Sequence, residues 1–364
     1  MNRKIIRFIP IISVLIGLVV GGIIIALLGK NPFLAFYNLL QGSGLAPKAS
    51  YAGKKGMITD FTSFLDAWTP MIFAALAVAV ALRAGLFNIG VSGQMLAAGF
   101  LATITIGYSG LAFGLAKPMV LLIGIIGGAA VGALIGFLKH KFNINEVVSA
   151  IMLNYILQYI FSFFINTYFV DPVSRQSKSV SAASRLTLKE VPIGGYKMDI
   201  PLGILLAVLV VFLIRFLLER TTLGFELKAI GFSKTAAKYA GINVGKNIVI
   251  AMTISGALSG LSGVTFYLGY FASIQPKVLS STGFDAIAVS LLGNSHPVGI
   301  LFSSFLITIL DKGSTYMAST AGIQEEIASV ITGVILLFCA CNAFIRSKLL
   351  TRESRSKKIE QEGK

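Results

Sequence analysis

Four carboxamide side chains lie within or beside long apolar stretches: Asn88, Gln94, Asn154 and Gln158. A carboxamide donates and accepts hydrogen bonds without carrying charge, so it suits a neutral polar ligand. Asn154 follows Glu146 by eight residues, which places it about 12 Å further along a helix, with Gln158 one turn later on the same face. Such groups must face other helices or a polar cavity. We expect the four to border the path of a polar solute.

The acidic residues lie elsewhere. They fall at the predicted ends of membrane spans rather than at their centres: Glu146, Asp285, Asp311, Glu325 and Glu326. Ion-coupled carriers commonly hold ionisable groups inside their spans, so this placement disfavours an ion-coupled carrier that works alone. The chain also lacks a Gly-x-x-x-x-Gly-Lys-Ser/Thr loop for nucleotide phosphates. We expect no catalytic residue, no metal site and no cofactor in this chain, and hence no enzyme.

A polar, basic segment, residues 224–242, separates two long apolar stretches. Ser233 can cap a helix by accepting a backbone N–H at its start, and Gly241 can end that helix in the left-handed conformation. The helix between them, residues 234–240, is too short to be stable alone in water, so we expect it to dock on another surface. The alternative is an ordinary basic cytoplasmic loop. The small residues that would let another backbone approach are Ala236, Ala237 and Ala240.

The composition indicates a membrane protein. Of 364 residues, 55% are hydrophobic and only 13% are charged, whereas a soluble domain is about 45–50% apolar and 25% charged. The net charge of +16 comes from short basic segments that flank apolar stretches, which favours membrane topology over nucleic-acid binding. Cys339 and Cys341 have a spacing that suits neither a disulfide nor a zinc site.

The apolar stretches predict an all-α polytopic fold with about ten transmembrane helices. Basic residues at the N-terminus and in the tail from Arg346 place both termini in the cytoplasm, which requires an even number of crossings. Between the first two spans we expect an interfacial helix over 32–40, and residues 171–200 form a second external loop. The predicted spans are 8–28, 67–86, one ending near 108, 118–138, one beginning near 145, 201–218, 247–270, 285–294, 297–311 and 326–343.

Two segments rich in glycine interrupt these spans, at residues 85–96 and 293–299. Each is either a tight turn or a broken helix beside a substrate path. Together with the topology they predict a single transmembrane domain, 1–364, that holds two inverted four-helix repeats, 67–170 and 247–345, and a cytoplasmic loop, 219–246. Small residues on spans 118–138 and 247–270 predict close helix packing; they are Gly124, Gly128, Gly132, Gly136, Ser255, Gly256, Ser259, Gly260 and Gly263.

Three segments together resemble the permeases of bacterial ATP-binding-cassette (ABC) importers, and most closely their nucleoside branch, which is related to the ribose and branched-chain amino acid permeases. They are residues 87–96 (FNIGVSGQML), 145–156 (NEVVSAIMLNYI) and 224–242. The first two are the more specific to the nucleoside branch, and the third is shared more widely. The resemblance covers nearly the whole chain. A monosaccharide or another small polar solute stays open as the alternative cargo.

The resemblance implies a complex in the bacterial plasma membrane. Its members would be two permease subunits, identical or different, a separate ABC subunit that binds ATP and Mg²⁺, and an extracellular substrate-binding lipoprotein. The segment 224–242 would be the loop through which the ATPase drives the permease. The residues expected to couple the two are Gly224, Glu226, Ala229, Gly231, Ser233, Ala236, Ala237, Gly241 and Ile242.

Overall fold

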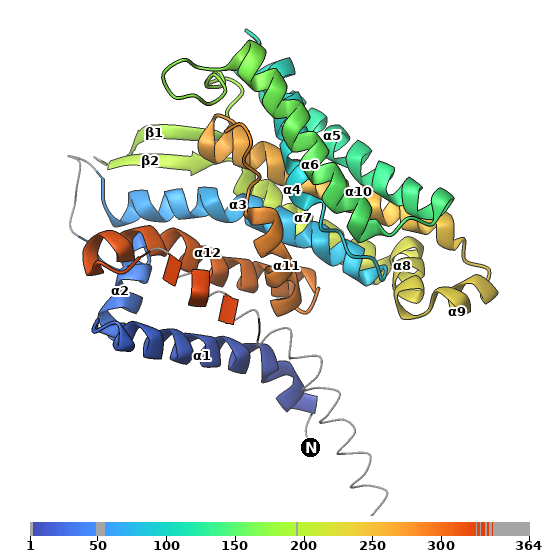
Figure 1. The fold of residues 1–364 in the computed structure, drawn as a ribbon, viewed down its shortest axis with the longest axis horizontal. Coiled ribbons are helices and arrows are strands. Elements are labelled where there is room, and N and C mark those ends of the chain that lie inside the picture. Colours follow the sequence, from blue (N-terminus) through green and yellow to red (C-terminus); the bar gives the residue numbers. More distant parts are fainter. Residues whose placement is uncertain are drawn as a thin grey trace, which may run out of the picture. The chain divides into compact units, whose positions relative to one another are not determined.

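The structure, a computed structural model, describes residues 3–48, 55–193, 196–324 and parts of 326–337. The all-α polytopic fold expected from the sequence is confirmed (Figure 1). The α-helices are α1 (Arg3–Leu27), α2 (Pro32–Gly42), α3 (Met57–Arg83), α4 (Val91–Ala102), α5 (Phe113–Phe142), α6 (Glu146–Phe164), α7 (Gly203–Arg220), α8 (Thr222–Phe232), α9 (Lys234–Tyr239), α10 (Val244–Thr265), α11 (Thr282–Leu292) and α12 (Pro297–Ala321).

Three of these helices continue into a short π-helical segment. Helix α4 is followed by η1 (Thr103–Gly107), α6 by η2 (Ile165–Phe169) and α10 by η3 (Phe266–Phe271). The two strands described, β1 (Thr187–Ile193) and β2 (Tyr196–Pro201), form an antiparallel hairpin. In Figure 1 this hairpin lies at one end of the surrounding helices, and α8 and α9 lie at the opposite end.

Five described helices are long and apolar enough to cross a membrane. They are Met57–Arg83, Phe113–Phe142, Glu146–Phe169, Val244–Phe271 and Pro297–Ala321. A sixth span is possible if the bent pair Val14–Leu27 and Pro32–Gly42, at 117° to each other, counts as one. The count of ten stays a prediction. Most of the tenth predicted span, with Cys339, Cys341 and the basic tail, lies outside the described residues.

The chain divides into two compact units, residues 1–46 with 309–364 and residues 47–308. In the first unit, helix α2 confirms the short helix predicted over 32–40. Asn31 caps it by accepting hydrogen bonds from the backbone N–H groups of Phe33 (2.9 Å) and Leu34 (3.3 Å). The second unit holds every group discussed below as a candidate site. The proposed repeats, 67–170 and 247–345, stay a prediction.

The small-residue faces of α5 and α10 pack together as the sequence predicted. A Cβ atom added at Gly128 would collide with the backbone of Gly256 and Gly260, and one added at Gly132 would collide with Met252 and Gly256. The two helices therefore touch backbone to backbone, which only residues without bulky side chains permit. Ser255 and Ser259 on the same face of α10 are fully buried. This contact fixes the frame that carries the breaks and the basic segment.

Three element boundaries differ from the predictions. Helix α3 begins at Met57 rather than near residue 67, because its polar first turns are paired: Thr59 donates to the Lys197 carbonyl (2.9 Å). Helix α12 runs to Ala321 rather than ending at Asp311: it continues through Gly313 and stops before Gly322, which adopts a positive φ of 59°. The segment predicted as a second external loop, 171–200, holds nearly all of the β1–β2 hairpin, which no periodic pattern had predicted.

Candidate functional site

Each of the two predicted glycine-rich segments, 85–96 and 293–299, contains a break between helices, but each break is shorter than the predicted segment. Helix α3 ends at Arg83 and α4 begins only at Val91, and α11 ends at Leu292 before α12 begins at Pro297. We call residues 84–90 the first break and residues 293–296 the second break. Gly85 has a φ of 67°, which L side chains rarely adopt. Asn88 is the one polar side chain of the first break, since its other six residues are apolar residues or glycines.

Asn88 is the centre of a buried hydrogen-bond network in the first break. It is fully buried. Its side-chain amide donates to Gln94 Oε1 (3.0 Å) and to Ser255 Oγ on α10 (2.8 Å), and its Oδ1 accepts from the Gly90 backbone N–H (2.9 Å). Because an unpaired buried polar group costs about 1–3 kcal/mol, this network fixes the non-helical backbone against α10.

Asn154 on α6 holds the same break from the other side. Its Oδ1 accepts from the Gly93 backbone N–H (3.0 Å), and its amide donates to the Ile89 carbonyl (3.1 Å). Gln158 lies apart and donates to the Lys277 carbonyl (2.6 Å). Three of the four carboxamides therefore meet around the first break, with their hydrogen-bonding groups directed at one another and at the backbone. Their assignment to a substrate path stays a prediction.

The basic segment forms two short helices, α8 and α9, with the caps that the sequence predicted. Ser233 Oγ accepts from the Ala236 backbone N–H (3.3 Å), and Gly241 closes the segment with a φ of 82°. Helix α9 ends at Tyr239, one residue before the predicted end. Thr221 caps α8 in the same way, by accepting from the Gly224 backbone N–H (3.1 Å). The corner between the two helices is thus built from local hydrogen bonds.

Part of this segment docks on its own chain rather than facing outward. Ala237 is only 3% exposed, whereas Ala236 and Ala240 are exposed. A Cβ atom at Gly231 would collide with the Arg83 carbonyl, and one at Gly224 with the backbone of α7. Glu226 accepts a hydrogen bond from Asn247 on α10 (2.7 Å). The coupling role expected of these residues stays a prediction; Gly224 and Ala237 are buried, and Gly231 is exposed apart from its close contact with the Arg83 carbonyl.

Two aromatic residues that the sequence reasoning did not single out are the most exposed large hydrophobic side chains of this segment. Phe232 is 92% exposed at the end of α8, and Tyr239 is 89% exposed at the end of α9. Both lie in a polar, basic segment outside the apolar stretches. An aromatic residue in such a segment is the feature by which the sequence could have identified them. Exposed aromatic side chains are enriched where proteins bind one another. We call Phe232, Tyr239 and the exposed residues between them the coupling surface.

Arg83 joins the first break to the second. Its guanidinium donates from Nε to the Ser295 carbonyl (3.0 Å) and from Nη2 to the Asn294 carbonyl (3.2 Å). Asn294 and Ser295 both have positive φ values, 54° and 49°, so this turn is held in a conformation that most residues avoid. Beside it, His296 Nε2 lies 3.0 Å from Glu219 Oε1 at the end of α7. The arginine thus spans the two breaks next to Gly231.

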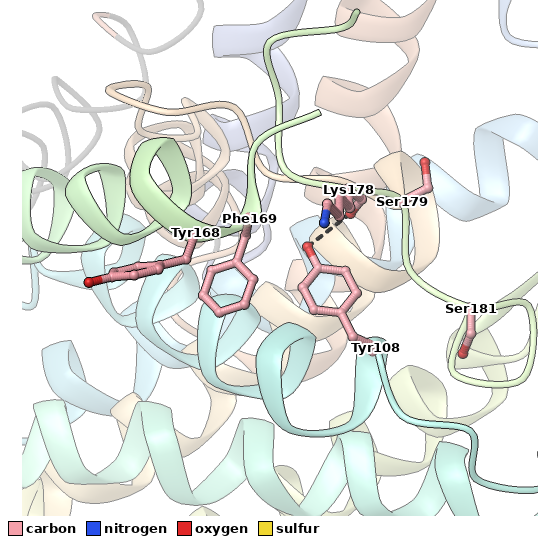
Figure 2. A pocket seen from close by; sticks show the side chains of 7 residues that line it. Tyr108, Tyr168, Phe169, Lys178, Ser179 and Ser181 are labelled. Atoms are coloured by element: carbon pink, nitrogen blue, oxygen red, sulfur yellow. Dashed lines mark hydrogen bonds between the residues drawn. The ribbon is translucent and has the colours of Figure 1, made fainter. Parts of the chain in front are cut away.

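A cleft lies where the π-helical segments η1 and η2 end (Figure 2). Its volume is about 490 Å³. Helix α4 runs from the first break to η1, so these ends lie a full helix length away from Gly231 and the coupling surface. We call it the aromatic cleft. It is lined by Gly107, Tyr108, Tyr168, Phe169, Lys178, Ser179 and Ser181.

Comparisons with known proteins agree with one another. The chain is 32% identical to the nucleoside ABC transporter permease protein NupB of Lactococcus lactis subsp. cremoris, over 96% of this chain and 94% of that one. It is 34% identical to the guanosine ABC transporter permease protein NupP of Bacillus subtilis, over 93% of this chain and 94% of that one. A second Lactococcus relative, the nucleoside ABC transporter permease protein NupC, is 24% identical over 71% of this chain and 82% of its own.

The family model described as the permease component of the branched-chain amino acid transport system matches residues 61–340. That match takes in both breaks, the four carboxamides, the coupling surface and the aromatic cleft. The helices that are long and apolar enough to span a membrane agree with it. The chain is a multi-pass membrane protein and belongs to this family of ABC transporter permeases.

Proposed function

We propose that this chain is the membrane-spanning permease subunit of an ATP-driven importer for nucleosides. The observation that carries the proposal is the pair α8–α9. It presents two almost fully exposed aromatic side chains at one end of the helices, and its base is fastened to both breaks through Gly231 and Arg83. Similarity to two permeases named for nucleoside and guanosine transport, each over more than nine tenths of both chains, supports the cargo.

In this proposal the motor is a separate ABC subunit, which binds ATP and Mg²⁺ and receives the coupling surface. Phe232 and Tyr239 insert into that subunit, while the flanking lysines Lys234 and Lys238 add charge at the rim. Buried aromatic anchors surrounded by a polar rim are the usual energetic pattern of a specific protein interface. Hydrolysis in the partner then needs no nucleotide-binding loop in this chain.

The internal contacts supply a route for movement. When the ATPase pulls on α8, Gly231 bears directly on the Arg83 carbonyl, and the Arg83 guanidinium carries the displacement to Asn294 and Ser295. The first break is tied to α10 and α6 by Asn88 and Asn154. Closely packed backbones transmit a shift without absorbing it. We therefore propose that both breaks move together between outward-open and inward-open states.

The remaining members of the complex are a second permease subunit and an extracellular substrate-binding lipoprotein. This chain aligns over nearly its whole length with NupB and over a shorter part with NupC, two permeases of one organism. That difference supports a heterodimer in which this chain is the longer subunit. We place the complex in the plasma membrane with the coupling surface and both termini in the cytoplasm, as the basic flanking residues favour.

Uptake by cells that lack this chain tests the function. Restoring the chain together with its partner subunits should restore ATP-dependent uptake of radiolabelled guanosine, adenosine and uridine, and uptake should stop when the ATPase subunit is inactivated. Uptake of ribose or glucose in place of nucleosides would establish the alternative cargo. Uptake by the purified chain alone under an ion gradient would show an ion-coupled carrier and contradict the proposal.

A further inference from the structure

We propose that the aromatic cleft is a nucleoside-binding site at the outer end of the permease, in which the base lies against aromatic rings and the ribose faces hydroxyl groups. The proposal rests on the nucleoside function proposed above. It concerns residues that the sequence reasoning left without a role: Tyr108, Tyr168, Phe169, Lys178, Ser179 and Ser181.

Three aromatic rings lie in a row along the cleft, and the last of them, Tyr168, is tilted by 60° to Phe169. Tyr108 and Phe169 are stacked with centroids 5.7 Å apart, and Phe169 and Tyr168 have centroids 6.3 Å apart. Figure 2 shows the three rings side by side, with Tyr168 at one end of the row. Tyr168 is 63% exposed, so the row has an open end. Every nucleobase has an aromatic face that can stack on such rings, whichever hydrogen-bond donors and acceptors its edge carries.

The rest of the lining is polar and carries a single charge. The loop that passes the rings contributes Lys178, Ser179 and Ser181; in Figure 2 the Ser179 hydroxyl points away from the rings, and Ser181 Oγ lies 2.9 Å from Ser184 Oγ. No carboxylate lines the cleft among the described residues. Hydroxyl groups can accept and donate hydrogen bonds to sugar hydroxyls. Aromatic rings beside a loop that carries hydroxyl groups match a nucleoside, which has one aromatic half and one polyhydroxyl half, better than they match a free sugar.

The loop is fastened to both π-helical segments, so the cleft is formed before any ligand arrives. The Lys178 backbone N–H donates to the Phe169 carbonyl (2.9 Å), and that of Ser181 donates to the Gly107 carbonyl (2.9 Å). Tyr108 Oη donates to the Lys178 carbonyl (3.0 Å). Binding to a preformed site avoids the entropy cost of ordering a loop. The volume of about 490 Å³ also falls within the roughly 300–1,000 Å³ of small-molecule sites.

The helices that end at the cleft support a functional role. The α4–η1 and α6–η2 pairs both change from α-helical to π-helical hydrogen bonding one turn before it. Such π-helical turns are rare and occur often at functional sites. An interfacial belt of aromatic residues would account for the exposure of Tyr168. It would not account for a hydroxyl-bearing loop fastened across the ends of two π-helical segments.

A fluorescent reporter in the assembled complex tests the site. The wild-type chain has one tryptophan, Trp68, so Tyr168→Trp in the permease–ATPase complex in nanodiscs, without the external binding protein, adds one emitter. Guanosine and uridine should quench the added emission relative to the wild-type complex, and D-ribose should not. Absence of quenching by both nucleosides up to their solubility limits would overturn the proposal.

Alanine variants give a second readout. Tyr168→Ala should raise the guanosine Kd of the same complex, measured by calorimetric titration, by about 10-fold, since a stacked base contributes about 1–3 kcal/mol. Tyr168→Phe keeps the ring and should change Kd by less than about 2-fold, within a few tenths of a kcal/mol. The matched control is Tyr159→Ala on α6, because Tyr159 is also 63% exposed and lies outside the cleft. An equal loss in Tyr159→Ala would overturn the assignment.

The outcomes separate this proposal from the one on which it rests. If cells with the wild-type chain import nucleosides but Tyr168→Trp shows no quenching, the cleft has no part in binding and the proposed function stands. If the wild-type chain imports sugars and no nucleoside, the proposed function fails and the cleft proposal fails with it. If Tyr168→Ala weakens only the binding of the external protein, the cleft is a protein contact and the nucleoside site is refuted.

Discussion

Gly231 on α8 packs against the main-chain carbonyl of Arg83, at the point where α3 ends and the first break begins. A Cβ atom at position 231 would collide with that carbonyl and come 3.1 Å from the Gly85 backbone nitrogen. The side chain of the same Arg83 donates to the two carbonyls of the second break. Arg83 therefore contacts α8 through its backbone carbonyl and the second break through its guanidinium.

We expect Gly231→Ala to destabilise the protein by about 1–3 kcal/mol, the usual cost of inserting a carbon into a closely packed contact. Thermal unfolding of the detergent-solubilised protein measures this. Gly114→Ala on α5 is the control, because a Cβ atom there meets nothing within 4 Å, and its effect should stay within about 0.5 kcal/mol. Equal unfolding temperatures for Gly231→Ala and wild type would contradict the close contact.

Arg83→Gln should uncouple ATP hydrolysis from uptake. The variant keeps the backbone contact with Gly231 but loses charge-assisted hydrogen bonds, each of which contributes about 1.5–3 kcal/mol. Uptake should fall by about 10-fold or more while the complex still hydrolyses ATP. Arg215→Gln is the control, since its exposed pair with Glu219, four residues later on α7, is worth only about 0.3–0.5 kcal/mol. Normal uptake in Arg83→Gln would remove its transmitting role.

Replacing Phe232 or Tyr239 with alanine should weaken binding of the ATPase by about 10-fold or more, as expected for aromatic anchors of an interface. Both side chains are almost fully exposed, so stability of the isolated permease should change by less than about 0.5 kcal/mol. Phe302→Ala on α12 is the control, because Phe302 is 73% exposed but lies on a predicted span. Co-purification and surface plasmon resonance measure the affinity. Unchanged affinity in both variants would place the interface elsewhere.

Asn88→Ala should destabilise the protein by about 3 kcal/mol, because it leaves the Gln94 carboxamide and the Gly90 N–H without a partner in a buried place, while Ser255 keeps its hydrogen bond to the Ala77 carbonyl. Gln158→Ala removes one hydrogen bond of a partly exposed side chain and should cost about 1 kcal/mol. Thermal unfolding and uptake are measured on the same preparations. If Asn88→Ala loses uptake while its unfolding temperature is unchanged, the substrate-path prediction gains support over a positioning role.

The Lys189 ammonium on β1 predicts how stability depends on alkaline pH. Burial would lower the pKa of Lys189, but Asp66 (2.8 Å) and Asp199 (3.1 Å) raise it above its ordinary value of 10.5. Because the folded state holds this proton more tightly than the unfolded chain, its stabilising contribution is complete below the unfolded pKa and disappears as pH rises through the folded pKa. The unfolding temperature should therefore fall above about pH 10.4, and less so in Lys189→Met.

The sequence was most informative where a local rule acts alone. Ser233 and Gly241 define α9 because capping and left-handed conformations depend on nearest neighbours. The small residues of α5 and α10 identified the faces that meet, because only glycine, alanine and serine allow such an approach. The breaks at Gly85 and Gly293 followed from the same kind of reasoning. In each of these cases the residue type restricts the conformations and contacts that the backbone can adopt.

The use of the polar side chains was decided by tertiary structure. From the sequence, Asn88 and Asn154 were polar groups at depth that needed partners of some kind, and the structure supplies those partners from α10, from α6 and from the break itself. Likewise, the span predicted over 297–311 ended too early, since α12 continues to Ala321. Hydrogen-bond partners far apart in the chain are set by packing, and one sequence carries no direct record of that packing.

What the amino-acid order alone determined was the class of molecule: a helical membrane protein with interrupted spans and one capped, basic segment. Hydrophobicity and capping are properties of short stretches, so they survive without knowledge of the fold. Only the tertiary structure joined Arg83 to Ser295, turned Ala237 inward and Phe232 outward, and brought Tyr108 beside Phe169. Each of those outcomes depends on which helix faces lie against each other, and that is settled by the packing of the whole chain.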